Sequence, residues 1–380
     1  MRIAINCRSF LNKNYTGIGR YTYQLIQSLS EIDCKNEYLL YTPKRFFSTK
    51  RRIPQIPAKN FSLKIDRFCQ GMEKIVGPVD IIHCPSPESL NDMNASRIIV
   101  TVHDLIFKTY PQGHTQETIE ETQRQFKNII EKASKIICCS KSTLNDLNHY
   151  FSVDPAKTVL IYQGVNQKDF YPLDKEETQS AQTTIRSHGM DGPFILFVGT
   201  IEPRKNLRNI LSAFSFLKKE KKYCGKLAIV GMQGWNQDLS AVPQELDLKN
   251  DVVFTGFLSN CELRHFYNQA EVLAFPSFYE GFGFPILEAF SCGLPVVTSN
   301  VSSCPEIAQD AALTVDPRSV PEIAQALFRI IDDKNLREDL RQKGLKRSQQ
   351  FSFLNTARQT LEVYKDVYEN QRLLHCPQCP

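Results

Sequence analysis

The feature that most constrains this chain is a repeated alternation of short apolar runs with longer amphipathic stretches. Runs of this length that are apolar throughout are typical of strands buried on both faces, as in a parallel sheet covered by helices. Amphipathic stretches such as 21–30 and 117–133 predict the covering helices. The strands expected in the first half are residues 3–7, 38–41, 81–83, 98–102, 136–139 and 158–162.

The same alternation starts again after residue 193. The polar stretch between the two sets ends in Gly192-Pro193, which indicates a linker between domains. In the second set the expected strands are 194–198, 226–230, 252–255, 272–275, 295–298 and 312–315, and the expected helices are 207–219, 286–292, 321–332 and 335–351.

We therefore predict an α/β fold of two Rossmann-like domains facing across a cleft. Such a cleft is the default ligand site of these folds. The predicted bounds are 1–171 for the N-terminal domain, 172–192 for the linker and 193–357 for the C-terminal domain. A helix at about 358–380 is expected to pack back on the N-terminal domain.

Composition and charge are those of an ordinary globular protein. Hydrophobic residues make up 42% of the 380 residues and charged residues 23%, and the formal net charge is +5. So small an excess gives no reason to expect nucleic acid as a partner, although it is compatible with anionic phosphates or with peripheral contact to an anionic membrane. No apolar run approaches the roughly 20 residues that a bilayer-spanning helix needs.

The start of the chain lacks the pattern of a signal peptide, because Asn6 and Arg8 interrupt its apolar run. Several of the 12 cysteines lie inside apolar runs, where free thiols behave as small hydrophobic residues. We therefore expect reduced cysteines and a cytoplasmic protein, at the inner face of the membrane if it is peripheral.

The segment 275–297, FPSFYEGFGFPILEAFSCGLPVV, carries most of the functional information. Its loop contains Gly281 and Gly283, which let a backbone approach a ligand closely, and the N–H groups of the helix that follows suit an anion. Glu280 in the loop and Glu288 in the helix have seven residues between them, so the two carboxylates could accept hydrogen bonds from hydroxyl groups of one ligand. The alternative is a tight turn in which both glutamates cap the helix.

This segment resembles the signature of two glutamates with seven residues between them in retaining GT-B glycosyltransferases, specifically glycosyltransferase family four. Five motifs in the family's order are far more specific than any one of them. Bacterial mannosyl- and rhamnosyltransferases of polysaccharide assembly are the subgroup that the chain resembles. The other four motifs are TGIGRY at 16–21, VHDL at 102–105, VGTIEPRKN at 198–206 and SNVSSCPEIAQDAALTVDP at 299–317.

The resemblance implies that the C-terminal domain binds a nucleotide diphosphate sugar and that the N-terminal domain meets the acceptor. Lys205 and Arg204 would hold the diphosphate, and Glu288 the ribose. Glu280 and the glycine loop would hold the hexose, while TGIGRY and His103 would lie against the donor. The implied catalytic residues are Glu280, His103, Lys205 and Arg204, and the implied donor-binding residues are Gly17, Gly19, Gly281, Phe282, Gly283 and Glu288.

Each assignment has a structural alternative. An Arg-Lys pair is most often a pair of solvated charges, a histidine at a strand end is most often just hydrogen-bonded, and TGIGRY could be a plain glycine turn. The chain also departs from the family pattern. Thr200 stands where many members have arginine, and Gln163 and Asn166 replace the usual Asn and Asp of a turn.

The expected function is transfer of a hexose, with mannose from GDP-mannose as first candidate, to a hydroxyl of a glycan or lipid-linked acceptor, with retention at the anomeric carbon. No D-x-D triplet occurs in the sequence, so we expect no metal and no cofactor. Two rivals stay open: a nucleotide-sugar epimerase of the same architecture and a non-catalytic nucleotide-sugar-binding protein. The basic stretch 44–59 indicates a solvated face or a membrane contact, and the CxxC at 376–379 lacks the second pair that zinc needs.

Overall fold

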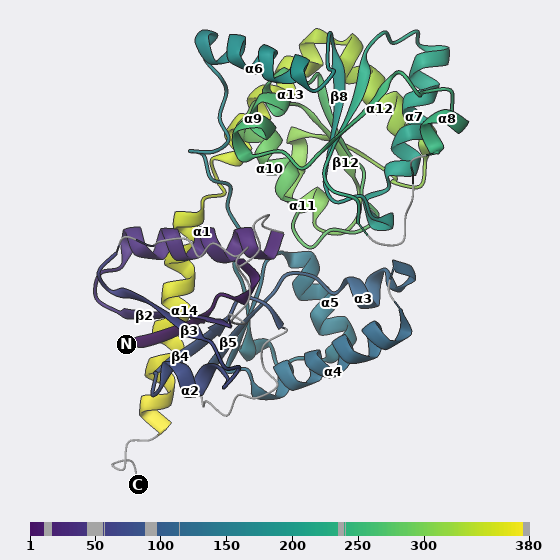
Figure 1. The fold of residues 1–380 in the computed structure, drawn as a ribbon. Helices are drawn as coiled ribbons and strands as arrows, with labels where there is room; N and C mark the ends of the chain where they lie inside the picture. The colour runs from purple at the N-terminus through teal and green to yellow at the C-terminus, as the bar shows by residue number, and fades with distance from the viewer. Residues whose placement is uncertain are drawn as a thin grey trace. The chain divides into compact units, whose positions relative to one another are not determined.

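The structure, a computed structural model, describes residues 1–10, 17–43, 56, 58–87, 97–113, 115–234, 239 and 241–374. Most of the basic stretch 44–59 and all of the CxxC at 376–379 lie outside these residues. The chain forms two units (Figure 1). The N-terminal unit consists of Met1–Lys108, His114–Gly164 and Phe353–Pro380, and the C-terminal unit consists of Thr109–Gly113 and Val165–Ser352.

A seven-stranded parallel sheet in the order β3-β2-β1-β4-β5-β6-β7 forms the core of the N-terminal unit. The six strands expected from the apolar runs are present, with ends that differ by at most two residues. The sequence does not predict β3, because this edge strand has only one buried residue and lacks an apolar run. The strands are β1 (Arg2–Asn6), β2 (Glu37–Pro43), β3 (Phe61–Asp66), β4 (Ile81–Cys84), β5 (Ile98–Val102), β6 (Lys135–Cys138) and β7 (Thr158–Leu160).

The end of the chain completes this N-terminal unit. Helix α14 (Phe353–Leu374) packs against α1 (Gly17–Ile32) and crosses it, as the yellow and purple helices of Figure 1 show. The Thr356 hydroxyl donates to the Tyr162 carbonyl at 2.8 Å, and the Lys135 ammonium lies 3.2 Å from the Asp366 carboxylate. The other helices are α2 (Met72–Val76), α3 (Ile106–Thr109), which ends in the C-terminal unit, α4 (Gln116–Lys132) and α5 (Lys141–Phe151).

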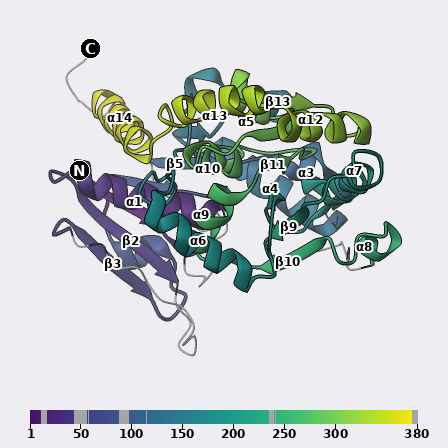
Figure 2. The same ribbon diagram turned by 90° about the horizontal axis from the view of Figure 1, so that it is seen from above.

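The C-terminal unit has a six-stranded parallel sheet in the order β10-β9-β8-β11-β12-β13. All six were expected from the apolar runs, and Figure 2 shows helices such as α7 (Leu207–Glu220) and α12 (Val320–Asp332) beside them. The strands are β8 (Phe194–Val198), β9 (Lys226–Val230), β10 (Val252–Gly256), β11 (Val272–Phe275), β12 (Val296–Ser299) and β13 (Leu313–Val315).

Helices α7 and α12 are amphipathic and bury their apolar side chains on the sheet; Ile210, Phe214 and Leu327, for example, have no exposed surface. Among the described residues, no helix combines the length and the apolar content needed to cross a bilayer. The helices are α6 (Lys175–Ser187), α7 (Leu207–Glu220), α8 (Val242–Glu245), α9 (Asn260–Gln269), α10 (Phe284–Ser291), α11 (Cys304–Ala308), α12 (Val320–Asp332) and α13 (Lys334–Ser348).

Both sheets have the strand order of a Rossmann fold, which confirms the predicted α/β fold with two Rossmann-like domains. The order reverses between β1 and β4 in one unit and between β8 and β11 in the other. Ligands of open parallel sheets bind beyond the carboxyl ends of the strands at such a point. In the C-terminal unit, VGTIEPRKN follows β8 and the glycine-rich carboxylate segment follows β11, so the topology brings these two motifs together.

A buried histidine links the N-terminal sheet to the last helix. The ring nitrogens of His83 in β4 lie 2.7 Å from the Tyr364 hydroxyl and 2.9 Å from the Thr101 hydroxyl, and the side chain has no exposed surface. Burial, together with the nearby His103, lowers the pKa of His83 to about 3. The imidazole is therefore neutral in the folded protein at physiological pH.

This burial predicts a loss of stability in mild acid. An unfolded imidazole has a pKa of about 6.5, so the unfolded chain binds a proton that the folded chain does not. The stabilisation is present above the unfolded pKa and is lost as the pH falls toward the folded one, by up to about 1.4 kcal/mol per pH unit. The slope of the unfolding free energy with pH reports how many protons the chain takes up when it unfolds. Urea unfolding at several pH values should show that His83→Gln lowers this uptake by about one proton. The same substitution at the exposed His149 should leave the dependence as in wild type, and identical slopes for all three proteins would contradict the prediction.

Candidate active site

The glycine-rich segment turns sharply between β11 and α10. Gly283 precedes the helix with φ 98°, a conformation that strains any residue with a side chain, and a Cβ there would lie 3.2 Å from Ile286 Cδ1. Pro285 occupies the first turn of the helix, where no N–H is needed. The Phe282 ring packs edge-on against Phe284 and Phe351 at 5.4 and 6.1 Å. The segment therefore has a fixed backbone that is anchored by a buried ring.

The VGTIEPRKN segment is tied to this loop through Asn206. The residue has φ 62° and starts α7, and its side-chain amide donates to the carbonyls of Pro276 at 2.8 Å and Pro317 at 2.6 Å. The Phe278 N–H also donates to the Arg204 carbonyl at 2.8 Å. These bonds hold the segments after β8 and β11 side by side.

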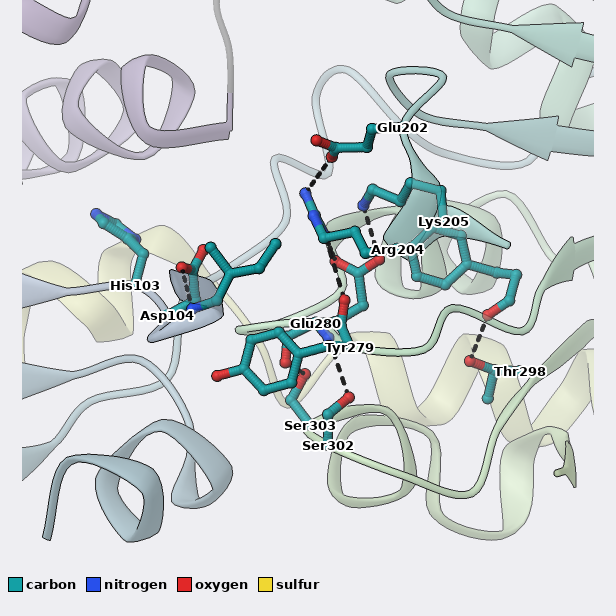
Figure 3. Close-up of polar contacts among 12 residues, drawn as sticks. His103, Asp104, Glu202, Arg204, Lys205, Tyr279, Glu280, Thr298, Ser302 and Ser303 are labelled. Carbon is teal, nitrogen blue, oxygen red and sulfur yellow. Dashed lines mark hydrogen bonds and ion pairs between the residues drawn. The ribbon is translucent and has the colours of Figure 1, made fainter. Parts of the chain in front are cut away.

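Four charged side chains from these segments form one buried network, which we call the Glu280 cluster: Glu202, Arg204, Lys205 and Glu280 (Figure 3). Lys205 Nζ lies 2.7 Å from Glu280 Oε1, and Arg204 Nη1 lies 2.9 Å from Glu280 Oε2. Arg204 Nη2 lies 2.6 Å from Glu202 Oε1. The side chains of Lys205 and Glu280 are only 9% and 7% exposed, so this pair is shielded from water.

The charges of the Glu280 cluster balance. Burial alone would raise the pKa of Glu280, but Lys205 and Arg204 outweigh burial and hold that pKa below its usual range. Burial and the neighbouring Arg204 lower the pKa of Lys205, while Glu280 and Glu202 oppose this. The sequence predicted Lys205 and Arg204 as cations offered to a ligand. In the structure both cations are paired with carboxylates, and one of these, Glu202, was not predicted as a site residue.

Glu288 lies in the middle of α10, and its residue is only 2% exposed. Its Oε2 accepts a hydrogen bond from the Tyr267 hydroxyl of α9 at 2.9 Å. The two glutamates of the signature therefore have different surroundings. Glu280 is surrounded by cations in a loop, and Glu288 is held by a phenol within a helix.

His103 follows β5 in the N-terminal unit, and both of its ring nitrogens are engaged. Nε2 lies 2.7 Å from the Pro85 carbonyl, which can only accept, and Nδ1 lies 2.8 Å from the Gln163 amide nitrogen, which can only donate. These partners fix a neutral ring with its proton on Nε2. Burial lowers the pKa of His103, in agreement with that tautomer. Gln163, which replaces the family's asparagine, thus contacts His103, and its Oε1 is buried without a partner among the described residues.

The remaining predicted residues have less informative surroundings. Gly17 and Gly19 lie in the first turn of α1 and do not form the plain glycine turn that was the alternative for TGIGRY. The Asp104 carboxylate accepts from the Ile106 N–H at 3.1 Å, as a cap of the following turn would. Gly281 is half-buried. Among the described residues, no group of three or more His, Cys, Asp or Glu side chains is arranged to hold a metal ion.

The Glu280 cluster predicts a strong energetic coupling. Lys205→Met and Glu280→Gln should each destabilise the C-terminal unit by about 3 kcal/mol, because each removes one charge of a buried ion pair. The double variant should lose less than the sum of the two. Urea unfolding of the four proteins measures the coupling. Lys343→Met, which breaks an exposed pair with Asp339, should barely move the midpoint. Additive losses at Lys205 and Glu280 would show that the two charges do not depend on each other.

Two family models match the chain. The model described as Glycosyltransferase Family 4 matches residues 15–169, and the model described as Glycosyl transferases group 1 matches residues 179–347. O-antigen chain mannosyltransferase B of Escherichia coli is 28% identical over an alignment of 375 positions that covers 92% of this chain and 96% of that protein.

Two solved structures share the fold over nearly the whole chain. Sucrose-phosphate synthase from Thermosynechococcus elongatus has a TM-score of 0.80 at 22% identity and covers 97% of this chain and 100% of its own. Anabaena Alr3699/HepE in complex with UDP and glucose has a TM-score of 0.74 at 16% identity and covers 96% of this chain and 100% of its own. With matched family models for both halves and a relative similar along its whole length, the chain belongs to the GT-B glycosyltransferases of family four, as its ordered motifs predicted.

Proposed function

We propose that the protein is a retaining hexosyltransferase that moves a hexose, with mannose as first candidate, from a nucleotide diphosphate sugar to a hydroxyl of a glycan or lipid-linked acceptor. The observation that carries the proposal is the Glu280 cluster, in which two cations and a loop carboxylate meet beyond β8 and β11. Cations at this point of a Rossmann-like sheet suit a diphosphate, and a carboxylate suits sugar hydroxyls. Mannose is preferred because the relative similar over its whole length is named a mannosyltransferase.

The two cations have the main electrostatic task in this reaction. Negative charge develops on the departing diphosphate, and positive groups that are already in place stabilise it in the transition state. Lys205 acts as a point charge, and the planar guanidinium of Arg204 can donate two parallel hydrogen bonds. Glu202 Oε1 lies 2.6 Å from Arg204 Nη2 and orients this guanidinium. Glu288 is assigned to the ribose and Glu280 to the hexose.

His103 is assigned to positioning and not to proton transfer, because both of its ring nitrogens already have partners. Retaining transfer of this kind does not require a protein base, since the leaving phosphate can accept the acceptor's proton. Peripheral contact with an anionic membrane would bring a lipid-linked acceptor within reach. That contact stays a prediction from the charge of the stretch 44–59.

A nucleotide panel tests the proposal. Thermal shift with nucleosides, nucleotides and nucleotide sugars should show stabilisation that is strongest for a nucleoside diphosphate and its sugar, because a ligand of the native state raises the apparent stability. Lys205→Ala should weaken binding of the diphosphate by roughly tenfold to a hundredfold and leave the nucleoside nearly unchanged. Equal losses for both ligands would contradict the assignment of Lys205.

The rivals have their own outcomes in the same experiment. A nucleotide-sugar epimerase would convert the donor that the panel selects without any acceptor, which chromatography of the donor would reveal. A non-catalytic binding protein would bind that donor and leave it unchanged even with acceptor glycans present. Formation of a glycosylated product with the donor's anomeric configuration supports the proposal.

Substitution of the two glutamates should have different effects on the affinity for a free nucleoside diphosphate. Glu280→Gln removes the carboxylate that occupies Lys205 and Arg204, so affinity for the free nucleoside diphosphate should stay the same or rise, while turnover falls. Glu288→Gln should weaken the nucleotide and the nucleotide sugar together, because the ribose is common to both. Calorimetry and turnover measurements on both variants decide this. A loss of diphosphate affinity in Glu280→Gln as large as that in Glu288→Gln would refute the separate roles.

A further inference from the structure

The backbone of Glu280 is held by two neighbouring serines. Its N–H donates to Ser302 Oγ at 3.1 Å, and its carbonyl accepts from Ser303 Oγ at 3.0 Å (Figure 3). The serines lie between β12 and α11, 22 and 23 residues along the chain from Glu280. Both polar backbone groups of the loop glutamate are thus satisfied by side chains of a different segment.

Ser302 adopts a conformation that its residue type disfavours. Its φ is 56°, in the left-handed region where glycine is free of strain and other residues are not. A residue with a side chain stays in this region only where the surrounding structure offsets the strain. The bond from the Glu280 N–H to the Ser302 hydroxyl is a contact that glycine could not make.

The Ser303 side chain does not cap the helix that it precedes. It is the N-cap residue of α11, where a serine side chain usually accepts from the helix's own N–H groups. Here the side chain makes no such bond, and the fully buried hydroxyl donates to the Glu280 carbonyl instead. Two adjacent serine hydroxyls therefore bond to the backbone of Glu280, although Ser302 has a strained φ and Ser303 leaves its helix uncapped.

We propose that Ser302 and Ser303 are positioning residues that fix the Glu280 backbone and so aim its carboxylate for the reaction. The carboxylate oxygens lie 2.7 and 2.9 Å from Lys205 and Arg204, a geometry that depends on where the Glu280 Cα is held. A catalytic group displaced by about 1 Å can lose up to about a hundredfold in rate. The link to catalysis rests on the proposed function, whereas the positioning of Glu280 does not.

Three variants and a matched control test this inference on the full chain. Ser302→Ala removes the hydroxyl and keeps the strain, Ser302→Gly removes both, and Ser303→Ala removes the second hydroxyl. The control is Ser152→Gly. Ser152 is also in the left-handed region, at φ 48° after α5, and belongs to the N-terminal unit. It therefore reports the effect of a serine-to-glycine change on strain without any contact to Glu280.

Amide hydrogen exchange at Glu280 in the ligand-free protein is the first measurement. Exchange should accelerate about tenfold in Ser302→Ala and Ser302→Gly, because the N–H loses its acceptor, and stay as in wild type in Ser152→Gly. The thermal midpoint of Ser302→Gly should be no lower than that of Ser302→Ala, since glycine relieves the strain. Unchanged exchange at Glu280 in both Ser302 variants would overturn the positioning of Glu280.

Steady-state kinetics, with GDP-mannose as the first donor probe, is the second measurement. The kcat of all three variants should fall about tenfold while KM for the donor stays within about twofold, since the contacts with the nucleotide are intact. A kcat that falls only in step with the thermal midpoint, or that falls equally in Ser152→Gly, would overturn the link to catalysis. If wild-type protein turns over no nucleotide sugar at all, the proposed function fails, and the exchange data still decide whether the serines position Glu280.

Discussion

The buried ion pair between Lys205 and Glu280 is the interaction on which the candidate site depends. Burying either charge alone would cost several kcal/mol. Lys205 is tolerated because Glu280 lies 2.7 Å away, and Glu280 is tolerated because Lys205 and Arg204 both contact it. The two residues are 75 positions apart in the sequence. They meet because β8 and β11 are neighbours in the C-terminal sheet, and that adjacency is also where the strand order reverses. The topology therefore determines where the charges meet.

Around this pair, three segments fix one another. Asn206 bonds to the carbonyls of Pro276 and Pro317, and the serines after β12 bond to the Glu280 backbone. These contacts are hydrogen bonds, whereas the strands and helices beneath them are packed through apolar side chains. The apolar core gives the strands their order, and the polar side chains then define the loop conformation above it. A rigid scaffold with polar loops at the strand ends is the usual division in binding sites of this fold class.

The sequence predicted what local patterns determine. Twelve strands follow from apolar runs; most of them are buried, and a strand covered on both faces has to be apolar throughout. The edge strand β3 carries no such requirement and was missed. In the site, the signature glutamates and the Arg-Lys pair were identified by motif, but their pairing was not, because an ion pair between distant segments depends on tertiary geometry. Glu202 and the two serines were missed for the same reason, since each has an ordinary local explanation as a cap or a surface charge.

The charge balance of the Glu280 cluster limits how a donor can bind, if the proposed function holds. The free site contains two cations and two carboxylates, so an incoming diphosphate would add negative charge to a neutral, buried group. Binding therefore requires that Lys205 and Arg204 turn at least partly from Glu280 to the phosphates, which leaves the Glu280 carboxylate in need of new donors. The hydroxyl groups of the hexose supply such donors, and a nucleotide without its sugar does not. Exchange of partners at one carboxylate would thus favour the complete donor over the spent nucleotide.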